Sequence, residues 1–464
     1  MTAIVWYRRD LRVHDHPALR AALDAHDVVA PAFCFDEQLL KGRHASGNRT
    51  QFMLECLSDL DASLRDRGGC LYVRRGRPEL ELPALAQEIG ATAVYVTRDV
   101  GPLARKRQEQ VRAALAEIEI ELLTHPGLFA VDALGAIRTG AGSPYTVFTP
   151  FWRNWTGQPR REVTGAARSV PAPRGRVTRG RLPTLAALGL QQEADDPAPG
   201  GESAGRAALE RFLGGPISDY SKGRNTLTGE SVSRLSPYLH FGCLSPREIE
   251  QRLPSGAGAA AFHRQLCWRD FYAHVLGHFP ANAHSEFQQR YRGTIRWSHA
   301  EKRFQAWCEG RTGFPSVDAG MRQLSREGWM HNRARLIVGS FLTKDLGIDW
   351  RWGERWFMRH LLDGDQASNN GNWQWIASVG VDPAPAFQRI FNPTLQQRRF
   401  DPDGAYVRRY VPELADVPDD FLAEPWTMPE EVQEQAGCRI GSDYPEPVVD
   451  HRRAREEALA RYRV

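Results

Sequence analysis

The sequence predicts an α/β domain built on a doubly wound, parallel five-stranded sheet, followed by a large all-α domain. Three observations support this fold class. The first 130 residues alternate short apolar runs with helical periods, which is typical of parallel sheets. Helical periods dominate from about residue 205 onward, where strand-like runs are scarce. A chain of 464 residues is also long enough for two or more domains.

The predicted strands are five apolar runs, at Ala3–Tyr7, Val28–Phe35, Leu71–Arg74, Ala93–Thr97 and Ile120–Leu123. Segments with a helical period separate them, at Pro17–Ala25, Thr50–Arg67, Glu79–Ile89 and Leu103–Ile118. Ligands on such sheets bind beyond the carboxyl ends of the strands. No strand is followed by G-x-G-x-x-G, and G-x-x-x-x-G-K-[ST] is absent, so the sheet is not an obvious dinucleotide or nucleoside-triphosphate site.

Residues 131–205 are rich in Pro and Gly and are predicted to connect the two domains without strong secondary structure. The segment is long for a plain loop, so part of it is expected to wrap around the domains. Residues 206–464 follow as the helical domain, in which we expect roughly ten or more helices. Clear helical periods lie at 207–213, 246–252, 259–276, 317–327, 333–346 and 354–362.

Composition excludes several classes of protein. Hydrophobic residues make up 42% of the chain and charged residues 25%, as in ordinary globular proteins. No apolar run reaches the length of a membrane span, and the N-terminus lacks a signal-peptide layout. The seven Cys are scattered without a C-x-x-C pair, which argues against zinc clusters and disulfide frameworks and favours a reducing cytoplasm. The net charge of +4 does not by itself require nucleic acid.

Trp and Arg are unevenly distributed along the chain. Ten of the 13 Trp lie at or after residue 268, and Trp297, Trp350 and Trp373 are read by default as packing residues. The late Arg residues fit phosphate binding or, as the more common case, a solvated face. They are Arg389, Arg398, Arg399, Arg408 and Arg409.

Residues 363–375, Asp-Gly-Asp-Gln-Ala-Ser-Asn-Asn-Gly-Asn-Trp-Gln-Trp, form the most informative segment. Asp and Asn are poor helix formers, and no apolar stripe runs through the polar part, so the side chains are expected to bind something polar and flat. Asp363 and Asp365 resemble a metal or acid/base pair. No His or further carboxylate stands at ligand spacing nearby, which makes metal a minor alternative. An ion pair between Asp363 and Arg335 is a simpler use.

A second polar segment begins after Tyr220, where Ser233 and Ser236 flank Arg234 directly before a Pro. Hydroxyls and backbone N–H groups at a helix start can bind an anion, and the alternative is a simple helix N-cap. Further along, His331 could titrate near neutral pH, although a structural role is more common for a lone His.

Two further helix faces combine amide and Arg side chains. Gln265, Trp268 and Arg269 fall at positions i, i+3 and i+4, which suits a stacked, hydrogen-bonded base or, equally, a core Trp beside a surface pair. Asn332 and Arg335 share a second face.

Taken together, these segments resemble the photolyase/cryptochrome flavoprotein family, and most closely the microbial class I-like photolyases of cyclobutane pyrimidine dimers. The similarity runs from Trp6 to about Trp426. The motifs that carry it are Ser233–Pro237, Cys267–Tyr272, Gly313–Arg322, Trp329–Arg333, Asp363–Asp365 and Asn369–Trp375.

The resemblance implies a folded-back FAD in the helical domain, with Asn369 facing the flavin N5. An amide can bond to N5 whether or not N5 is protonated, and it adds no charge beside a reduced flavin. Plant cryptochromes have Asp at this position and animal ones Cys, so Asn369 favours repair over signalling. The implied FAD-binding residues are Tyr220, Val232, Ser233, Arg234, Leu235, Ser236, Arg269, Arg335, Asp363, Gly364, Asp365 and Asn369.

The implied activity is light-driven DNA repair by a carbon–carbon lyase. Excited FADH⁻ passes an electron to a cyclobutane pyrimidine dimer flipped out of UV-damaged DNA, which splits into two pyrimidines. Trp297, Trp350 and Trp373 match the chain of residues that photoreduces the flavin. The positions that match lesion or DNA contacts are Arg224, Gln265, Trp268, Asn332, Arg333, Leu336, Trp375, Gln396 and Arg399.

Two positions depart from the dimer-photolyase pattern. Gln265 replaces the usual Glu and is typical of (6-4) photolyases, but those carry two His where this chain has Asn332 and Leu336. Leu336 also replaces the common Met. The alternatives to dimer repair are therefore a cryptochrome blue-light photoreceptor and, less favoured, a (6-4) photolyase. Photoreceptors often append a long tail, whereas this chain ends about forty residues after Trp426.

The family's N-terminal domain, here residues 1–130, holds an antenna chromophore. Leu103 and Ala104 stand where folate-binding members carry Asn and Glu, which speaks against methenyltetrahydrofolate. We expect 8-hydroxy-5-deazaflavin instead, with Asp99 as a contact, while an empty site or another flavin stays open. The protein is expected to act as a monomer, with damaged DNA as its partner and no membrane association.

Overall fold

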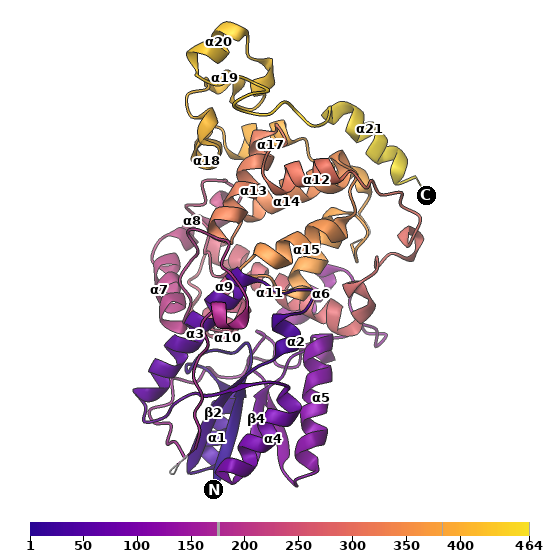
Figure 1. Ribbon diagram of the computed structural model, residues 1–464. Helices are drawn as coiled ribbons and strands as arrows, with labels where there is room; N and C mark the ends of the chain where they lie inside the picture. Colours follow the sequence, from indigo (N-terminus) through magenta and orange to yellow (C-terminus); the bar gives the residue numbers. More distant parts are fainter. Residues whose placement is uncertain (174–176, 383, 464) are drawn as a thin grey trace.

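The computed structural model describes residues 1–173, 177–382 and 384–463. It divides into a sheet domain at one end and a helical domain above it, joined by a long connector (Figure 1). Residues 174–176 of the predicted connector and residues 383 and 464 of the predicted helical domain lie outside the described residues.

The N-terminal sheet is parallel and five-stranded, with the order β3-β2-β1-β4-β5. The order reverses beside β1, as in doubly wound folds, so the predicted fold class is confirmed. The strands are nearly all buried, which explains why they read as continuous apolar runs. They are β1 Thr2–Tyr7, β2 Val28–Phe35, β3 Tyr72–Arg75, β4 Ala91–Thr97 and β5 Glu121–His125.

The helices that cover the sheet agree with the predicted ones to within a few residues. Pro78 and Pro102 each occupy the first turn of a helix that was predicted to start one residue later. Proline suits this position because its missing N–H would have no intrahelical partner there. The helices are α1 Pro17–Ala25, α2 Glu37–Leu40, α3 Gly47–Arg65, α4 Pro78–Ile89 and α5 Pro102–Ala116.

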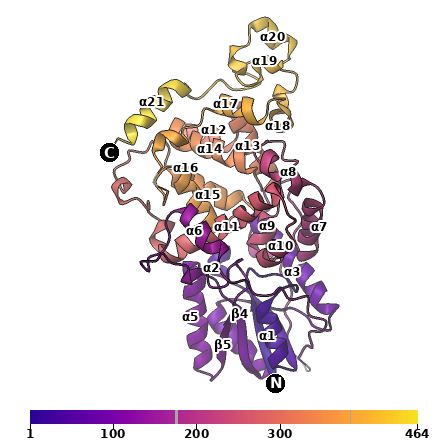
Figure 2. The same ribbon diagram turned by 180° about the vertical axis from the view of Figure 1, so that it is seen from behind.

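The connector contains regular structure that the sequence reading missed. Helix α6, Phe148–Thr156, lies beside the long helix α11, Ala257–His278 (Figure 2). Its buried side chains are Phe148, Phe151 and Trp155. Two short 3₁₀ turns, Leu134–Ala136 and Ala186–Leu188, also lie in this segment. The prediction of no strong secondary structure was therefore wrong for α6.

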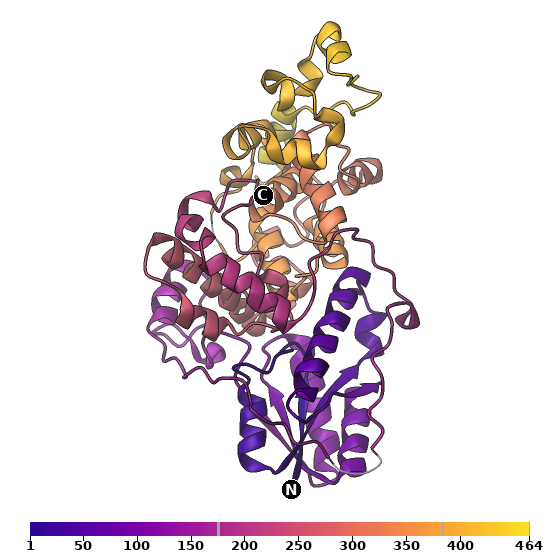
Figure 3. The same ribbon diagram turned by 90° about the vertical axis from the view of Figure 1, so that its left-hand side faces the viewer.

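The remaining helices form the C-terminal domain, and the segment with α18 to α20 projects away from the sheet (Figure 3). The helix predicted at 333–346 is α14 followed by a wider π turn, Phe341–Asp345. The domain's other helices are α7 Glu202–Leu213, α8 Pro216–Gly223, α9 Ser236–His240, α10 Pro246–Arg252, α12 Glu301–Cys308, α13 Pro315–Glu327, α14 Asn332–Ser340, α15 Trp350–His360, α16 Gln366–Ile376, α17 Pro393–Phe400, α18 Ala405–Tyr410, α19 Asp419–Leu422, α20 Glu430–Gln435 and α21 His451–Arg461, with 3₁₀ turns at Pro280–Ala283, Gln289–Tyr291, Ala386–Arg389, Pro412–Leu414 and Pro425–Thr427.

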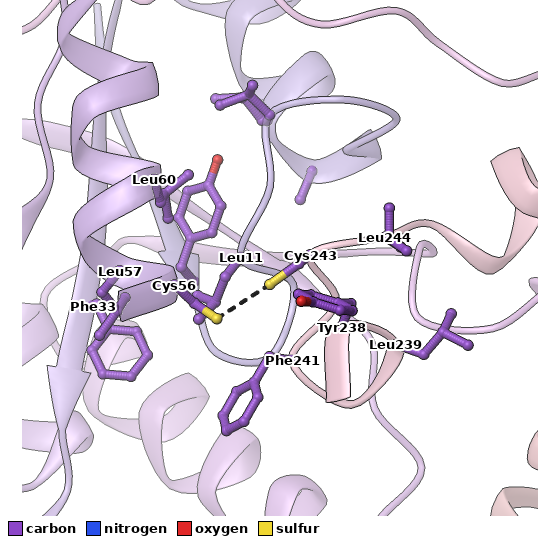
Figure 4. Packing of buried hydrophobic residues seen from close by; sticks show 14 of the residues in the cluster. Leu11, Phe33, Cys56, Leu57, Leu60, Tyr238, Leu239, Phe241, Cys243 and Leu244 are labelled. Carbon is purple, nitrogen blue, oxygen red and sulfur yellow. Dashed lines mark hydrogen bonds between the residues drawn. The ribbon is translucent and has the colours of Figure 1, made fainter. Parts of the chain in front are cut away.

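One hydrophobic core runs through both domains and fixes their relative position. The thiols of Cys56 on α3 and Cys243 after α9 lie 3.4 Å apart within it (Figure 4). The buried guanidinium of Arg12 donates to the carbonyls of Gly127 and Gly242, at 2.8 Å each. All seven cysteines are buried free thiols. None of the helices within the described ranges combines the length and apolar character that crossing a bilayer requires.

Candidate functional site

The helical domain encloses a cavity of about 620 Å³, bounded by α8, α9, α11, α14 and α16. This volume falls within the range of sites for small molecules and cofactors. Most residues singled out from the sequence meet here: Tyr220, Arg224, Val232, Ser233, Arg234, Leu235, Ser236, Gln265, Trp268, Arg269, Asn332, Arg333, Arg335, Leu336, Asp363, Asp365, Asn369, Trp373 and Trp375.

The polar segment at 363–375 folds as α16 because Asp365 caps it. The Asp365 carboxylate accepts a hydrogen bond from the Ser368 amide at 2.8 Å, which supplies a partner for one free N–H of the first turn. The same carboxylate accepts from Arg9 at 2.7 Å. Burial alone would raise the pKa of Asp365, but the charge of Arg9 and the Ser368 bond hold it below its ordinary value. The helix start therefore carries a fixed negative charge.

Asp363 and Arg335 form the ion pair expected from the sequence. Arg335 Nη2 lies 2.8 Å from Asp363 Oδ2, and Arg335 Nε donates to the Met330 carbonyl at 2.9 Å. The second oxygen of Asp363 is buried and finds no hydrogen-bond partner among the described residues. A buried acceptor without a partner costs about 1–3 kcal/mol, so this atom is suited to receive a donor from a bound ligand.

Asn369 presents its amide oxygen to the cavity. Its Nδ2 donates to the backbone carbonyl of Glu354 on α15 at 2.9 Å. That bond uses one of the two N–H groups of the amide, so the Asn369 side chain keeps its carbonyl oxygen as an acceptor and its second N–H as a donor for a ligand. The residue is buried, so its orientation is set by α15 rather than by solvent.

Segment 232–236 forms the opposite wall. Arg234 adopts a φ of +53°, a strained left-handed conformation for a residue with a side chain. Its guanidinium lies 4.4 Å from the Trp329 ring centroid and 3.1 Å from Glu327 Oε2. Ser236 Oγ accepts from Trp329 Nε1 at 3.2 Å. The N-cap position of α9 is Leu235, with no side-chain capping bond, so the simple N-cap alternative is wrong.

Trp375 is held by two residues that the sequence reading did not assign to the site. Its Nε1 donates to Asp382 at 3.0 Å, and the Arg389 guanidinium lies 4.1 Å from its ring centroid. Arg389 also pairs with Asp382 at 2.6 Å. Arg389 is buried, so the solvated-face interpretation of the late Arg cluster is wrong for this member.

The rim of the cavity is positively charged. Arg333 donates to Asn225 at 2.9 Å and to Gln396 at 3.4 Å, and the Phe400 ring contacts both Arg333 and Arg399. Burial lowers the pKa of Arg333, and Arg399 and Arg224 lower it further. Guanidinium groups this close repel one another, so the arrangement favours an anion such as phosphate. Gln396 and Arg399 do not line the cavity; Gln396 contacts the lining residue Arg333, and Arg399 shares the Phe400 ring with it.

Three other residues singled out from the sequence make contacts with the protein itself. Arg269 lines the cavity, but its guanidinium donates to the carbonyls of Leu128 at 2.7 Å and Leu239 at 3.2 Å. Gly364 faces away, where an added Cβ would lie 2.6 Å from Arg49 Nη1. His331 is buried, its pKa is lowered to about 4 by burial, and it caps α14 by accepting from the Arg333 amide.

The three Trp of the proposed relay belong to one hydrophobic core but differ in exposure. Trp373 lines the cavity and Trp350 is buried, whereas Trp297 is half-buried with its ring 6.4 Å from that of Tyr462. Trp307, which the sequence reading did not single out, lies 6.2 Å from Trp373 between ring centroids. Only its membership in the Trp-rich half could have signalled it.

A second hollow of about 320 Å³ lies at the carboxyl ends of the strands, on the seam between the domains. Asp99 borders it, but its two oxygens accept from Arg9 at 2.8 and 3.1 Å. Arg9 thereby bridges Asp99 of the sheet domain and Asp365 of the helical domain. His240 and Asp365 line this hollow and the larger cavity alike.

Comparisons with known proteins agree with this geometry. Residues 3–173 match the model of DNA photolyase, and residues 262–464 match the FAD binding domain of DNA photolyase. The chain is 43% identical to a deoxyribodipyrimidine photo-lyase of Streptomyces griseus, over 98% of this chain and 97% of that one. It is 39% identical to a cryptochrome DASH of Natronomonas pharaonis, over 97% and 98% of the two chains.

Solved structures give the same result. A bacterial class III photolyase from Agrobacterium tumefaciens superposes with a TM-score of 0.92 at 36% identity, covering 99% of this chain and 97% of that one. A Synechocystis cryptochrome gives 0.91 at 32% identity, covering 99% and 98%. An archaeal photolyase from Sulfolobus tokodaii with two FAD molecules gives 0.84 at 31% identity, covering 100% and 99%. With both domains matched and relatives this similar over nearly the whole chain, the protein belongs to the DNA photolyase family.

Proposed function

We propose that this protein is a DNA repair enzyme that uses blue or near-UV light to split cyclobutane pyrimidine dimers in UV-damaged DNA. One observation carries the proposal. A single cavity joins the polar start of α16, which suits a cofactor, to an aromatic and amide-lined half that opens at an Arg-rich rim. A flipped pyrimidine dimer and a cofactor would therefore meet without a protein layer between them.

The described residues fit FAD. The unpartnered Asp363 oxygen would accept from an N–H or O–H of the cofactor, and Asn369 would accept from a protonated flavin N5. Arg234, Ser233 and Ser236 would face its phosphates. Bound FAD in its reduced form supplies the light-excited electron that opens the dimer. Electrons that restore this form would enter through Trp297, Trp350 and Trp373.

The lesion half of the cavity would be read by shape and hydrogen bonds. Trp268 and Trp375 offer apolar faces for the pyrimidines, and Gln265 and Asn332 offer amides for their polar edges. The rim residues Arg224, Arg333, Gln396 and Arg399 would bind phosphates on either side of the dimer, so affinity should fall with salt.

For the antenna, we propose 8-hydroxy-5-deazaflavin in the hollow at the domain seam, with residues 1–130 as the antenna domain. Leu103, which borders this hollow, replaces the polar residue expected for folate. Asp99 is engaged by Arg9, so it would act on a chromophore through Arg9 rather than directly. The connector 131–205 and catalytic domain 206–464 complete this proposed division, and we expect a cytoplasmic monomer.

One experiment tests the function. The purified protein would be illuminated with oligonucleotides that carry either a cyclobutane dimer or a (6-4) photoproduct, after its absorption spectrum has been recorded. We expect a flavin spectrum with repair of the cyclobutane dimer. A flavoprotein that repairs neither lesion would favour the photoreceptor alternative. The chain's similarity to two cryptochromes is the observation that supports this alternative. Repair of the (6-4) product alone would assign the chain to that class of photolyase.

A further inference from the structure

We infer that helix α6 takes part in lesion recognition through Phe148, which positions the lesion-facing ring of Trp268. The inference rests on the proposed function of the cavity. Phe148 comes from the connector and is not among the residues that border the cavity in the described part of the chain. It is a positioning residue, because it would act on the dimer only through Trp268.

The two rings form a close parallel stack. Their centroids lie 3.7 Å apart and their planes differ by 1°. Phe271 meets the Trp268 ring edge-on at 5.6 Å, and Tyr272 is tilted toward it at 5.5 Å. Trp268 lines the cavity, so the stack covers one side of its indole and leaves another available to a ligand.

Helix α6 and the residues just before it are anchored to α11 by bonds that do not involve the stack. Trp155 Nε1 donates to Asp270 at 3.0 Å, and the Tyr145 amide donates to His274 at 3.1 Å. Asp270 and His274 follow Trp268 on α11. Removing the Phe148 ring should therefore leave α6 docked and free only the indole.

The outer side of the stack carries a positive charge. The Arg264 guanidinium lies 5.1 Å from the Phe148 ring centroid and 5.9 Å from that of Trp152. A cation over an aromatic ring adds attraction to the stack and holds it from the solvent side. Trp268 is thus fixed from behind before any ligand arrives, which spares the ordering of a large side chain during binding.

The test compares Phe148→Leu with Phe151→Leu in the full FAD-loaded protein. Both changes replace a buried Phe of α6 by Leu, but the Phe151 ring makes tilted contacts with Phe271 and His274 rather than a stack on Trp268. Affinities for a dimer-containing and an undamaged oligonucleotide are measured for each, together with flavin content and melting temperature.

We expect Phe148→Leu to weaken dimer binding between about twofold and tenfold, with undamaged DNA and flavin content unchanged. Phe151→Leu should lower the melting temperature without changing the ratio of the two affinities. Equal ratios in the two variants would overturn the inference.

A second measurement does not depend on DNA. In a crystal structure of Phe148→Leu, Trp268 should occupy more than one rotamer, and a single unchanged conformation would overturn the positioning role. Wild-type protein with no preference for dimer-containing DNA would instead overturn the proposed function, so the two failures are distinguishable.

Discussion

Substituting Gly353 by Ala should displace the cavity-lining Trp373. An added Cβ at Gly353 would lie 2.1 Å from Trp373 Cη2 and 2.6 Å from Leu342 Cδ2. Both neighbours are buried, at 3% and 0% exposure, so neither can swing into solvent. Overpacking of this kind costs about 1–3 kcal/mol, and the better helix propensity of Ala returns up to about 1 kcal/mol. A contact of 2.1 Å with a buried ring places the cost at the upper end of that range, so we expect a net loss of about 2 kcal/mol in the free energy of unfolding.

The assay combines urea denaturation with the rate of flavin photoreduction under blue light. Photoreduction should slow in Gly353→Ala because Trp373, the proposed relay residue on the cavity wall, must shift to accommodate the methyl group. Gly135→Ala serves as the control, since an added Cβ there meets nothing within 4 Å. A Gly353→Ala protein as stable as the wild type, with an unchanged photoreduction rate, would refute this reasoning.

Three further changes test other parts of the site. Asp363→Asn removes the charge opposite Arg335 and weakens the proposed bond from Asp363 to FAD. A charge-assisted bond contributes about 1.5–3 kcal/mol, so FAD should bind the apoprotein roughly ten- to hundredfold more weakly in a titration. Unchanged affinity would contradict the proposed role of Asp363. Arg399→Ala should weaken the binding of dimer-containing and undamaged DNA alike. It should also reduce the slope of the logarithm of the binding constant against the logarithm of the salt concentration by about one. An unchanged slope would show that Arg399 does not contact a phosphate. Burial raises the pKa of Asp270 to about 6 in the folded protein, whereas an Asp in the unfolded chain has a pKa of about 4. Between these two values the folded protein keeps a proton that the unfolded chain has lost. The free energy of unfolding should therefore fall by up to about 3 kcal/mol as pH rises from about 4 to about 6. Denaturation midpoints of Asp270→Asn should lack this slope, and an identical slope would assign it to other groups.

The sheet could be predicted from sequence because its strands are buried on both faces and separated by helical periods. Helical periods located the helical domain, and the density of Asp, Asn, Ser and Arg located the polar segments that line the cavity. Helix α6 escaped because Pro150 and the surrounding Pro and Gly residues indicated a loop. Pro150 occupies the third position of α6, in the first turn, where no intrahelical N–H bond is lost.

The contacts that complete the site could not be predicted because they join residues without a common period. Asp382 and Arg389 reach Trp375 from an irregular segment, and nothing in local spacing signals that Arg389 is buried. Gly364 was expected at the cofactor from the family resemblance. It lines the seam hollow and not the larger cavity, and its role stays a prediction.

The bridge from Asp99 through Arg9 to Asp365 joins residues 356 positions apart and could only be found in the structure. Arg9 is partly buried, yet its two carboxylate partners raise its pKa above the ordinary value, so all three groups stay charged. A partly desolvated charge requires its partners at fixed distances, because movement of either domain would leave it uncompensated. The residue that caps α16 therefore also fixes the orientation of the sheet domain. Since Asp365 and His240 separate the seam hollow from the larger cavity, the same bridge would hold an antenna at a constant distance and angle from the flavin, which is the condition for efficient transfer of excitation between them.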